Sequence, residues 1–387
     1  MNSPKYADFP KEEFELRWNR ARQLMKDQEL DALMVTEELN FSYFTGYRPN
    51  GLGSFYSKTR PLLFLLPADG QPTLMVNEFM KGDAAKRSWV PNIRSWLKVP
   101  FTISYVTDLL AELGLTESKI GAELGLEQRI EMPIQEFDRL RTRFPKIKFV
   151  DASEIIWKVR MKKSDLEVKK MEIASNATSK AYDRCFQDFR EGMTEKEVAQ
   201  IFSRYMIEEG ADRPGFVIVN SGPGESDRVC GTATDRKLSK GDTVWIDGGS
   251  VYDGYWADFS REGTVGPASP KQLQLHELVC EITNQCVDAV NPNVGVSEIM
   301  AVCNEQLKKA GMEPWRVGRI GHGLGMMITE QPSVSSDDKT VLEPGYVITV
   351  EPGLMTDVGM FCVEENVLVT NSGHRVLTSA SRELHTI

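Results

Sequence analysis

The sequence predicts a smaller α/β domain followed by a larger α+β domain, and two observations carry this prediction. Over roughly the first 155 residues, short apolar runs typical of buried strands alternate with segments of helical periodicity. Beyond residue 163 a long amphipathic helix begins at a capping signal, and strands joined by turn signals follow it. A chain of 387 residues is also long enough for more than one domain. We therefore expect domains at 1–155 and 156–387.

The first domain is expected to contain a sheet of short strands with helices around it. Apolar side chains recur at about helical spacing over residues 11–30, and Pro133–Phe144 is a second helix candidate. Five segments have the composition of buried strands: DALMVT, RPLLFLLP, PTLMVN, KIGAELG and KIKFVDA. The second and third of these are joined by the turn ADGQ, so we expect them to pair.

The second domain is expected to begin with a helix capped by Ser164, because Glu167 follows three residues later in a capping-box pattern. Thr194 and Glu197 repeat that pattern. The segment PNVGVSEIMAVC is similar, with Ser297 as the expected N-cap but Met300 in place of the acidic residue. This weak repeat predicts a domain built from two similar α/β halves.

Composition and charge exclude several classes of protein. The formal net charge is −10, which argues against nucleic acid as a partner because phosphate binding needs a basic face. No run of 18 apolar residues predicts a membrane span, and the first residues do not resemble a secretory signal. The six cysteines show no CxxC spacing. We therefore expect a cytoplasmic protein with reduced thiols.

One acidic pair is expected in a hairpin whose turn is Asp253-Gly254, a strong turn signal. With that turn, Asp247 at the end of one strand pairs with Ser260, and Asp258 on the next strand lies diagonally on the same face. Two such carboxylates repel each other unless a cation lies between them.

A second acidic pair is expected near the C-terminus. Glu351 ends a strand, Glu364 lies in the apolar strand MFCVEENVLV, and a turn near Asp357-Val358 places the two directly opposite each other. Unpaired charge inside apolar strands is costly. His322 stands between two glycines in GRIGHGLG, where a bare backbone allows close approach. Each residue alone has an ordinary structural explanation, whereas the ordered set of five indicates a metal site.

The segments IDGGSVYDGYWADFSR, GRIGHGLG, ITVEPGL and VEENVLVT resemble the pita-bread metallopeptidase family, which includes aminopeptidase P, prolidase and creatinase. LNFSYFTGY and DASEIIWKVRMKKSDLEVKKM resemble the N-terminal domain and domain junction of the prolidase/creatinase branch. The resemblance implies a creatinase-like α/β N-terminal domain and a pita-bread α+β catalytic domain with a dinuclear metal site.

The resemblance also implies roles for the five residues. Asp247 and Asp258 would bind a dinuclear centre, His322 and Glu351 would hold one metal, and Glu364 would bridge both. The oxygen-rich ligand set favours two divalent ions of Mn, Fe or Co, with Zn possible. Two metals lower the pKa of a bridging water towards neutrality. Glu351 would then be the catalytic proton shuttle.

The sequence departs from the family at three positions that contact substrate. The family histidine seven residues after the GHG histidine is Thr329 here, and a histidine before the first metal aspartate is replaced near Val229 or Cys230. An arginine two residues before the last glutamate is replaced by Cys362. Thr329 and Cys230 are therefore the expected substrate contacts, and Thr329 is a partial donor in catalysis.

These features predict a metal-dependent hydrolase of a small amide or Xaa-Pro-type peptide. Two alternatives stay open: an enzyme of the same fold acting on a small zwitterion, as a creatinase-like C–N hydrolase or a dimethylsulfoniopropionate-type lyase, and a non-catalytic binding protein. The family further implies a homodimer in which an N-terminal loop covers the neighbour's site. Arg48, Phe55 and Tyr56 in TGYRPNGLGSFYSKTR are the expected contacts from that loop.

Overall fold

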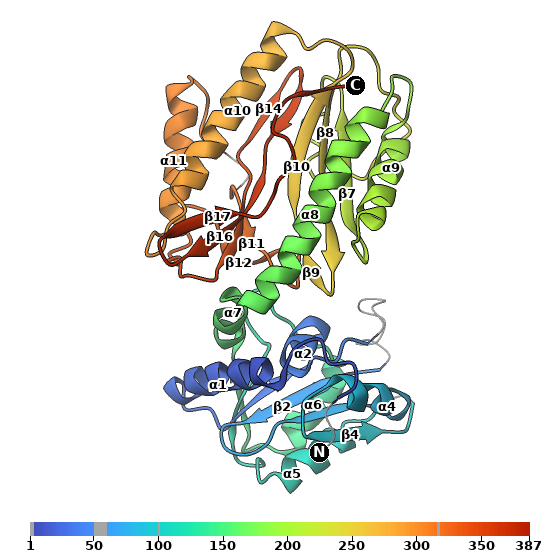
Figure 1. Cartoon of the computed structure of the whole chain (residues 1–387). Coiled ribbons are helices and arrows are strands. Elements are labelled where there is room, and N and C mark those ends of the chain that lie inside the picture. Colours follow the sequence, from blue (N-terminus) through green and yellow to red (C-terminus); the bar gives the residue numbers. More distant parts are fainter. Residues whose placement is uncertain (1–3, 50–59, 100, 316–317) are drawn as a thin grey trace. The chain divides into compact units, whose positions relative to one another are not determined.

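The computed structural model describes residues 4–49, 60–99, 101–315 and 318–387. Its internal contacts divide the chain into two compact units, Met1–Arg160 and Met161–Ile387. Each unit has its own sheets and its own buried core (Figure 1). The predicted classes, α/β for the first domain and α+β for the second, are confirmed.

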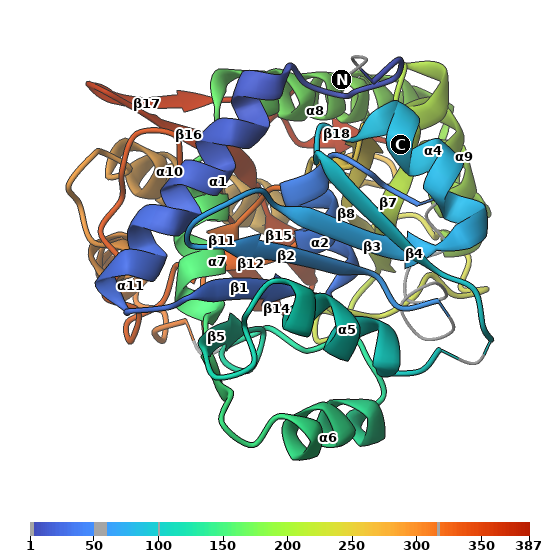
Figure 2. The same cartoon turned by 90° about the horizontal axis from the view of Figure 1, so that it is seen from below.

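The first unit is built on a six-stranded sheet in the order β4-β3-β2-β1-β5-β6. The five predicted strands are all present, and the predicted pairing of β2 with β3 is antiparallel. Figure 2 shows α1 on one side of this sheet and α5 and α6 on the other. Its strands are β1 Ala32–Val35, β2 Leu63–Pro67, β3 Thr73–Asn77, β4 Asn92–Trp96, β5 Lys119–Ala122 and β6 Lys148–Asp151. Its helices are α1 Lys11–Asp27, α2 Glu38–Thr45, α4 Glu78–Arg87, α5 Ser104–Glu112 and α6 Ile134–Arg143, followed by α7 Ser153–Met161.

Alternation of side chains explains why helices cover both faces of this sheet. Met34 and Leu65 pack with α5 and α6 residues in one core cluster. Phe64, adjacent to Leu65 and therefore on the opposite face, stacks on Phe44 of α2 with 5.6 Å between ring centroids. Two-sided burial requires strands that are apolar throughout, which is the pattern seen in the sequence.

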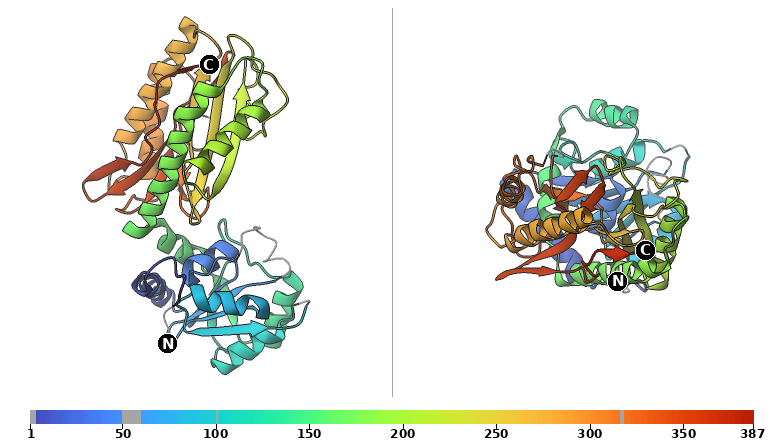
Figure 3. Two further views of the ribbon diagram at one scale, coloured as in Figure 1. Left: turned by 45° about the vertical axis from the view of Figure 1, so that its right-hand side comes forward. Right: turned by 90° about the horizontal axis from the view of Figure 1, so that it is seen from above.

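The first half of the second unit begins with α8 Asp165–Asp188 and α9 Glu195–Glu208, and both predicted capping boxes are formed. These helices pack against β7 Arg213–Ser221 and β8 Thr243–Tyr252 (Figures 1 and 3). The sheet continues through β10 Phe259–Thr264 to β18 His385–Thr386, and β9 Tyr255–Trp256 pairs with β8. Tyr182, Phe202 and Phe259 meet in its core.

The second half repeats the order of two helices followed by a sheet, as the weak sequence repeat predicted. The helices are α10 Pro270–Asp288 and α11 Val296–Lys309, which pack against each other. The sheet is β12-β11-β13-β16-β17, with β14-β15 as a separate ribbon. The strands are β11 His322–Gly323, β12 Glu330–Ser333, β13 Val347–Val350, β14 Gly353–Thr356, β15 Gly359–Cys362, β16 Glu365–Thr370 and β17 Gly373–Val376.

One predicted helix start is wrong. The helix expected to begin at Ser297 is capped two residues earlier, at Gly295. The backbone N–H of Gly295 donates to the carboxylate of Glu298 at 2.8 Å, so the acidic residue acts from the third helical position without a side-chain partner at the N-cap.

None of the helices in the described part of the chain combines the length and apolar character that crossing a bilayer requires.

Candidate metal centre

The first acidic pair lies in the predicted hairpin. Asp253 and Gly254 both have positive φ, as the turn requires, and Asp247 pairs with Ser260. Two details of the prediction are wrong. Asp247 lies in the middle of β8 rather than at its end, and Asp258 lies in a two-residue break between β9 and β10. The register of β8 and β10 on either side of this break keeps Asp258 close to Asp247.

The second acidic pair also follows the predicted register. The turn lies at Asp357-Val358, since Thr356 pairs with Gly359. Gly353 pairs with Cys362 in the β14-β15 ribbon, and Val350 pairs with Glu365 in the larger sheet. Continuing either register places Glu351 opposite Glu364. The predicted continuous strand is wrong, because β15 ends at Cys362 and β16 begins at Glu365. Glu351 and Glu364 therefore lie where the chain passes from the β14-β15 ribbon to the larger sheet.

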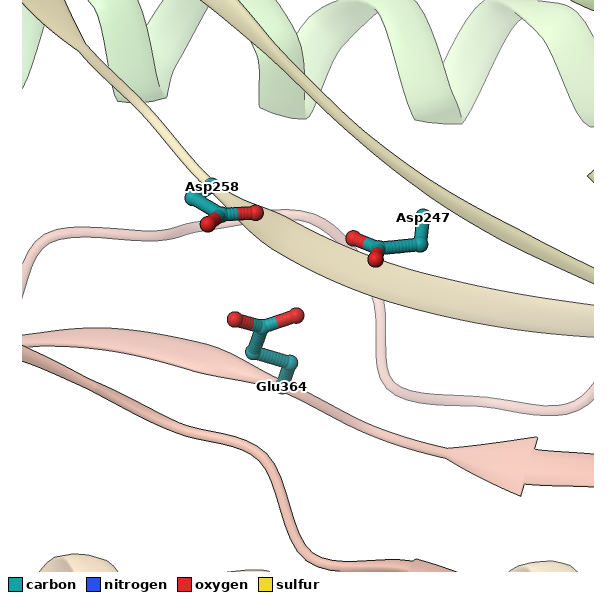
Figure 4. A group of neighbouring side chains, drawn as sticks. All are labelled: Asp247, Asp258 and Glu364. Carbon is teal, nitrogen blue, oxygen red and sulfur yellow. The ribbon is translucent and has the colours of Figure 1, made fainter. Parts of the chain in front are cut away.

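Three carboxylates from the two hairpins converge. Figure 4 shows Asp247, Asp258 and Glu364 turned towards one another from three different segments of the chain. One oxygen atom from each lies within 4.8 Å of the others. Asp258 and Glu364 are buried, and Asp247 remains partly accessible.

His322 and Glu351 extend this group from the other side of Asp258. The Nε2 atom of His322 lies 3.4 Å from Oδ2 of Asp258 and 3.6 Å from Oε1 of Glu351. Its Nδ1 atom is 3.0 Å from the Gly323 carbonyl oxygen. Nδ1–H donation to that carbonyl leaves the lone pair of Nε2 directed at the carboxylates. The five predicted residues are therefore brought together, with Asp258 shared between the two sides.

The glycines around His322 permit close packing of neighbouring strands. A Cβ atom on Gly321 would lie 2.1 Å from the Thr349 carbonyl oxygen, and one on Gly323 would lie 2.1 Å from the Gln331 carbonyl oxygen. The close approach inferred from the sequence is thus made by the chain's own backbone. It fixes His322 between β12 and β13.

Buried polar contacts hold the carboxylates in place. Asn366, fully buried, accepts the backbone N–H of Asp258 at 3.1 Å and donates to its carbonyl oxygen. The Thr349 hydroxyl accepts the N–H of His322 at 3.1 Å and lies 3.4 Å from Oε1 of Glu351. Arg261 donates to the carbonyl oxygen of Glu364 at 2.7 Å. Such contacts to the supporting backbone orient ligands in metal sites. Asn366 and Thr349 were not identified from the sequence.

Burial raises the pKa of each of the four carboxyl groups. Burial is the largest cause at Asp247, Asp258 and Glu364, and the neighbouring carboxylates add to it. The pKa of Glu351 is raised to about 7, mainly by burial. Burial and the nearby Arg319 charge lower the pKa of His322 to about 4, so its imidazole is neutral at pH 7.

The chemistry of this group fits divalent cations. Oδ1 of Asp247 and Oε1 of Glu364 are buried and accept no hydrogen bond from the described residues. Buried carboxylate oxygens without donors are costly unless a cation neutralises them. Four carboxylates and one neutral imidazole form the oxygen-rich donor set that hard or borderline divalent metals prefer.

Thr329, which replaces a family histidine, has a cationic neighbour that the sequence did not reveal. The Nη2 atom of Arg319 lies 3.4 Å from the Thr329 hydroxyl, and Nη1 lies 3.5 Å from the Ser333 hydroxyl. Arg319 also influences the pKa values of Asp258, His322 and Glu351. Arg319 stands two residues before the GHG segment, and the sequence gave no signal for this role, because the contact depends on how β11 and β12 pair, with a register shift between His322 and Gly323.

The other two departures from the family lie near an apolar cluster. Val229 packs with Trp245, Cys362 and Met360, whereas Cys230 is exposed. Trp245 lies two residues before Asp247 and hence on the same face of β8. Its buried indole N–H has no partner among the described residues. Because side chains along a strand alternate between its two faces, the sequence alone could have predicted Trp245 on the face of Asp247, and this signal was missed.

The N-terminal loop residues remain predictions. Arg48 forms an ion pair with Asp8 of the same unit, with 2.7 Å between Nη2 and Oδ2. Phe55 and Tyr56 lie outside the described residues. A contact from these three residues to a neighbour's site stays untested.

Two family models match the chain. Metallopeptidase family M24 matches residues 169–371, and the Creatinase/Prolidase N-terminal domain matches residues 17–162. The Xaa-Pro dipeptidase of Pyrococcus furiosus is 28% identical over 369 residues, which cover 95% of this chain and 99% of that protein. These matches span both units of the fold.

Solved structures give the same relationship. The prolidase from Pyrococcus horikoshii OT3 aligns with a TM-score of 0.83 at 27% identity, covering 95% of this chain and 99% of that one. Recombinant prolidase from Thermococcus sibiricus aligns with a TM-score of 0.86 at 27% identity, covering 97% and 99%. The two-domain architecture is therefore shared over nearly the full length of each chain.

Proposed function

Because the chain belongs to metallopeptidase family M24, we propose that it is a metal-dependent hydrolase that cleaves Xaa-Pro dipeptides or similar small amides. Relatives named Xaa-Pro dipeptidase and prolidase cover almost the whole chain and support this substrate class. The family implies divalent metal ions. The assignment of individual residues below is our proposal.

The observation that carries the proposal is the convergence of buried, donor-free carboxylate oxygens from two hairpins. Asp247 and Glu364 each present a buried oxygen without a hydrogen-bond partner among the described residues. Asp258 lies between them and His322, within 4.8 Å of the first two and 3.4 Å of the third. This arrangement has a cost in the protein alone, which bound cations would remove.

We assign the five residues to a pair of divalent ions, with Mn, Fe or Co favoured by the oxygen-rich donors. Asp247, Asp258 and Glu364 would hold one side, and Asp258, His322, Glu351 and Glu364 the other. When bound, such ions act as Lewis acids and lower the pKa of a coordinated water to near neutrality. The protein's own part is to fix the donors, which Asn366, Thr349 and Arg261 do through the contacts described above.

Glu351 is proposed as the group that moves a proton during hydrolysis. Its side chain keeps 28% exposure, so it borders the open side of the centre. Burial raises the pKa of Glu351 to about 7 in the metal-free chain. A carboxylate at this accessible position can take and return a proton. The Thr349 hydroxyl, 3.4 Å from Oε1, orients the carboxylate.

Turnover of a defined substrate panel tests the function. Purified protein loaded with Mn is assayed against Xaa-Pro dipeptides, dipeptides lacking proline, and small betaines, with chelator-treated protein as the control. We expect metal-dependent release of free proline. Turnover of betaines alone would favour the zwitterion enzymes considered above, and no turnover with metal bound would favour a binding protein.

A further inference from the structure

An apolar cluster adjoins the metal centre on the face of β8 that carries Asp247. One of its members, Ile218, pairs directly with Asp247 across β7 and β8. Another, Cys362, stands two residues before Glu364. Three members are only partly buried, so the cluster reaches solvent on that side. This Trp245 cluster consists of Ile218, Val229, Trp245, Trp315, Met360 and Cys362.

Two buried polar atoms at this cluster have no hydrogen-bond partner within the described residues. Trp245 and Asn220 lie directly opposite each other on β8 and β7, with 4% and 1% of their surface exposed. The indole Nε1–H of Trp245 is a donor without an acceptor, and Oδ1 of Asn220 is an acceptor without a donor. Nδ2 of Asn220 donates to the Glu225 carbonyl oxygen, which fixes the orientation of the amide. The donor and the acceptor therefore share one face of the sheet without satisfying each other.

The residue opposite Trp245 on the other neighbouring strand is engaged elsewhere. Glu262 pairs with Trp245 across β10 and β8. Its Oε1 atom lies 2.9 Å from Nδ1 of His276, and its Oε2 atom accepts the backbone N–H of Cys362 at 3.4 Å. Burying a polar group without a partner is costly. The unpaired donor and acceptor therefore indicate a place for a group from outside the chain.

We infer that Trp245 and Asn220 bind a neutral side-chain group of the substrate that both accepts and donates a hydrogen bond, namely a carboxamide or a hydroxyl. The group accepts from Nε1–H of Trp245 and donates to Oδ1 of Asn220, while its carbon atoms contact the apolar cluster. A carboxylate has no proton for Asn220, and an ammonium has no lone pair for Trp245. The inference rests on the proposed function, because only Xaa carries a variable side chain in an Xaa-Pro dipeptide. It makes both residues specificity-determining for Xaa.

Two pairs of dipeptides with side chains of matched shape test this specificity. Glutaminyl-proline is compared with methionyl-proline, and threonyl-proline with valyl-proline. An apolar analogue leaves the buried donor and acceptor unpaired, which predicts roughly a 10- to 100-fold preference in kcat/KM for the polar member of a pair. The pair that shows the preference distinguishes a carboxamide from a hydroxyl. No preference in either pair would mean that the two atoms hold a trapped water only, and the inference would be wrong.

Trp245→Phe removes the indole N–H and keeps an aromatic ring in the cluster. It should bring the ratio of the two kcat/KM values close to one, whereas damage to the fold would lower both values equally. Trp315→Phe is the matched control, because the Nε1–H of Trp315 already donates to the Arg319 carbonyl oxygen at 2.7 Å. This control should keep the ratio of the wild type. An unchanged ratio in Trp245→Phe would overturn the inference.

A binding measurement separates failure of this inference from failure of the proposed function. NMR of Zn-loaded Glu351→Gln protein with isotope-labelled tryptophan records the Nε1–H of Trp245, identified by its absence in Trp245→Phe. We expect the preferred polar peptide to move this signal downfield as the hydrogen bond forms, and its apolar counterpart to leave it in place. Efficient turnover without such a shift would overturn the inference alone. The shift without turnover by the wild-type protein would contradict only the proposed function. If no dipeptide binds, acetamide and methanol serve as probes, and the absence of a shift with both would overturn the inference as well.

Discussion

Glu123 of the first unit and the carboxylates of the metal centre differ in how their oxygen atoms are satisfied. Glu123 belongs to a cluster with Glu37, Glu38 and Glu131, the Glu123 cluster, in which Oε2 of Glu38 is buried without a hydrogen-bond partner among the described residues. Both oxygens of Glu123 accept hydrogen bonds, from the Thr36 backbone at 2.7 Å and from Asn40 at 2.8 Å among others. In the metal centre, Asp247 and Glu364 each retain an oxygen with no such donor in the described chain.

The comparison shows which property marks a functional site. Burial raises the pKa of Glu123 to about 7, and that of Glu351 to about 7 as well. Perturbed pKa values therefore do not distinguish the two groups. The supply of donors separates Glu123 from Asp247 and Glu364, because a carboxylate whose lone pairs are filled by N–H and O–H groups is part of the fold. The single donor-free oxygen of Glu38 has no second one converging on it, whereas those of the metal centre lie in one group of carboxylates. Carboxylates that converge without donors leave room for a cation.

The largest effect is expected when the centre loses a shared carboxylate. Asp258→Ala and Glu364→Ala should abolish metal binding and turnover together, because each residue is proposed to contact both ions. Elemental analysis of the wild-type protein should approach two transition metals per chain. Glu123→Gln is the matched control and should keep its metals. Full metal content and full rate in Asp258→Ala would show that the assigned ligand set is wrong.

Substitutions in the two clusters should change stability in opposite directions. In metal-free protein at pH 8, Glu364→Gln should raise the free energy of unfolding by about 1–3 kcal/mol, because it removes a carboxyl group whose raised pKa in the folded chain destabilises the fold at that pH. Glu123→Ala should lower it by about 2–4 kcal/mol, since the donors of Thr36, Glu37 and Asn40 are left unpaired. Hydrogen exchange of the β8 and β1 amides measures the unfolding free energy of each unit separately. If both substitutions raise that free energy, or both lower it, the proposed difference between the two clusters is wrong.

The Glu123 cluster should also give the first unit a pH dependence of known sign. The pKa of Glu123 is about 7 in the folded chain, against 4.5 for an ordinary glutamate, so the carboxyl group loses its proton at lower pH in the unfolded chain than in the folded chain. Stability from this group is complete below pH 4.5 and is lost as the pH rises to 7, by at most about 3 kcal/mol. The difference in unfolding free energy between wild type and Glu123→Gln should fall over this window, as measured by exchange at β1 and β5. A difference that is flat or rises would contradict the assigned cause.

Turn signals and the alternation of side chains predicted much of the centre. They did not predict contacts between residues far apart in the sequence. The Asp253-Gly254 turn and the period of two placed Asp247 opposite Ser260, because a hairpin turn fixes the register of both strands. Asn366 reaches Asp258 across 108 positions, and Asn40 reaches Glu123 across 83. No periodicity within a segment encodes such pairs. Arg319 was missed for the same reason, since its place beside Thr329 depends on how β11 and β12 pair.

The smallest effect is expected at Thr329, where the question is how much a missing donor matters. A threonine hydroxyl is short and neutral, so it gives less support to a developing negative charge than the histidine of relatives. One such donor typically contributes roughly 10²–10³ in rate. We therefore predict low kcat/KM on Xaa-Pro dipeptides, and a rise of about tenfold, below that full contribution, in Thr329→His with Mn bound. The gain should appear in kcat, because the donor acts on the transition state. Thr329→Gln controls for size without the imidazole. Wild-type values of about 10⁴ M⁻¹s⁻¹ or higher would show that Thr329 costs nothing, and that the remaining groups of the site already supply what the histidine would.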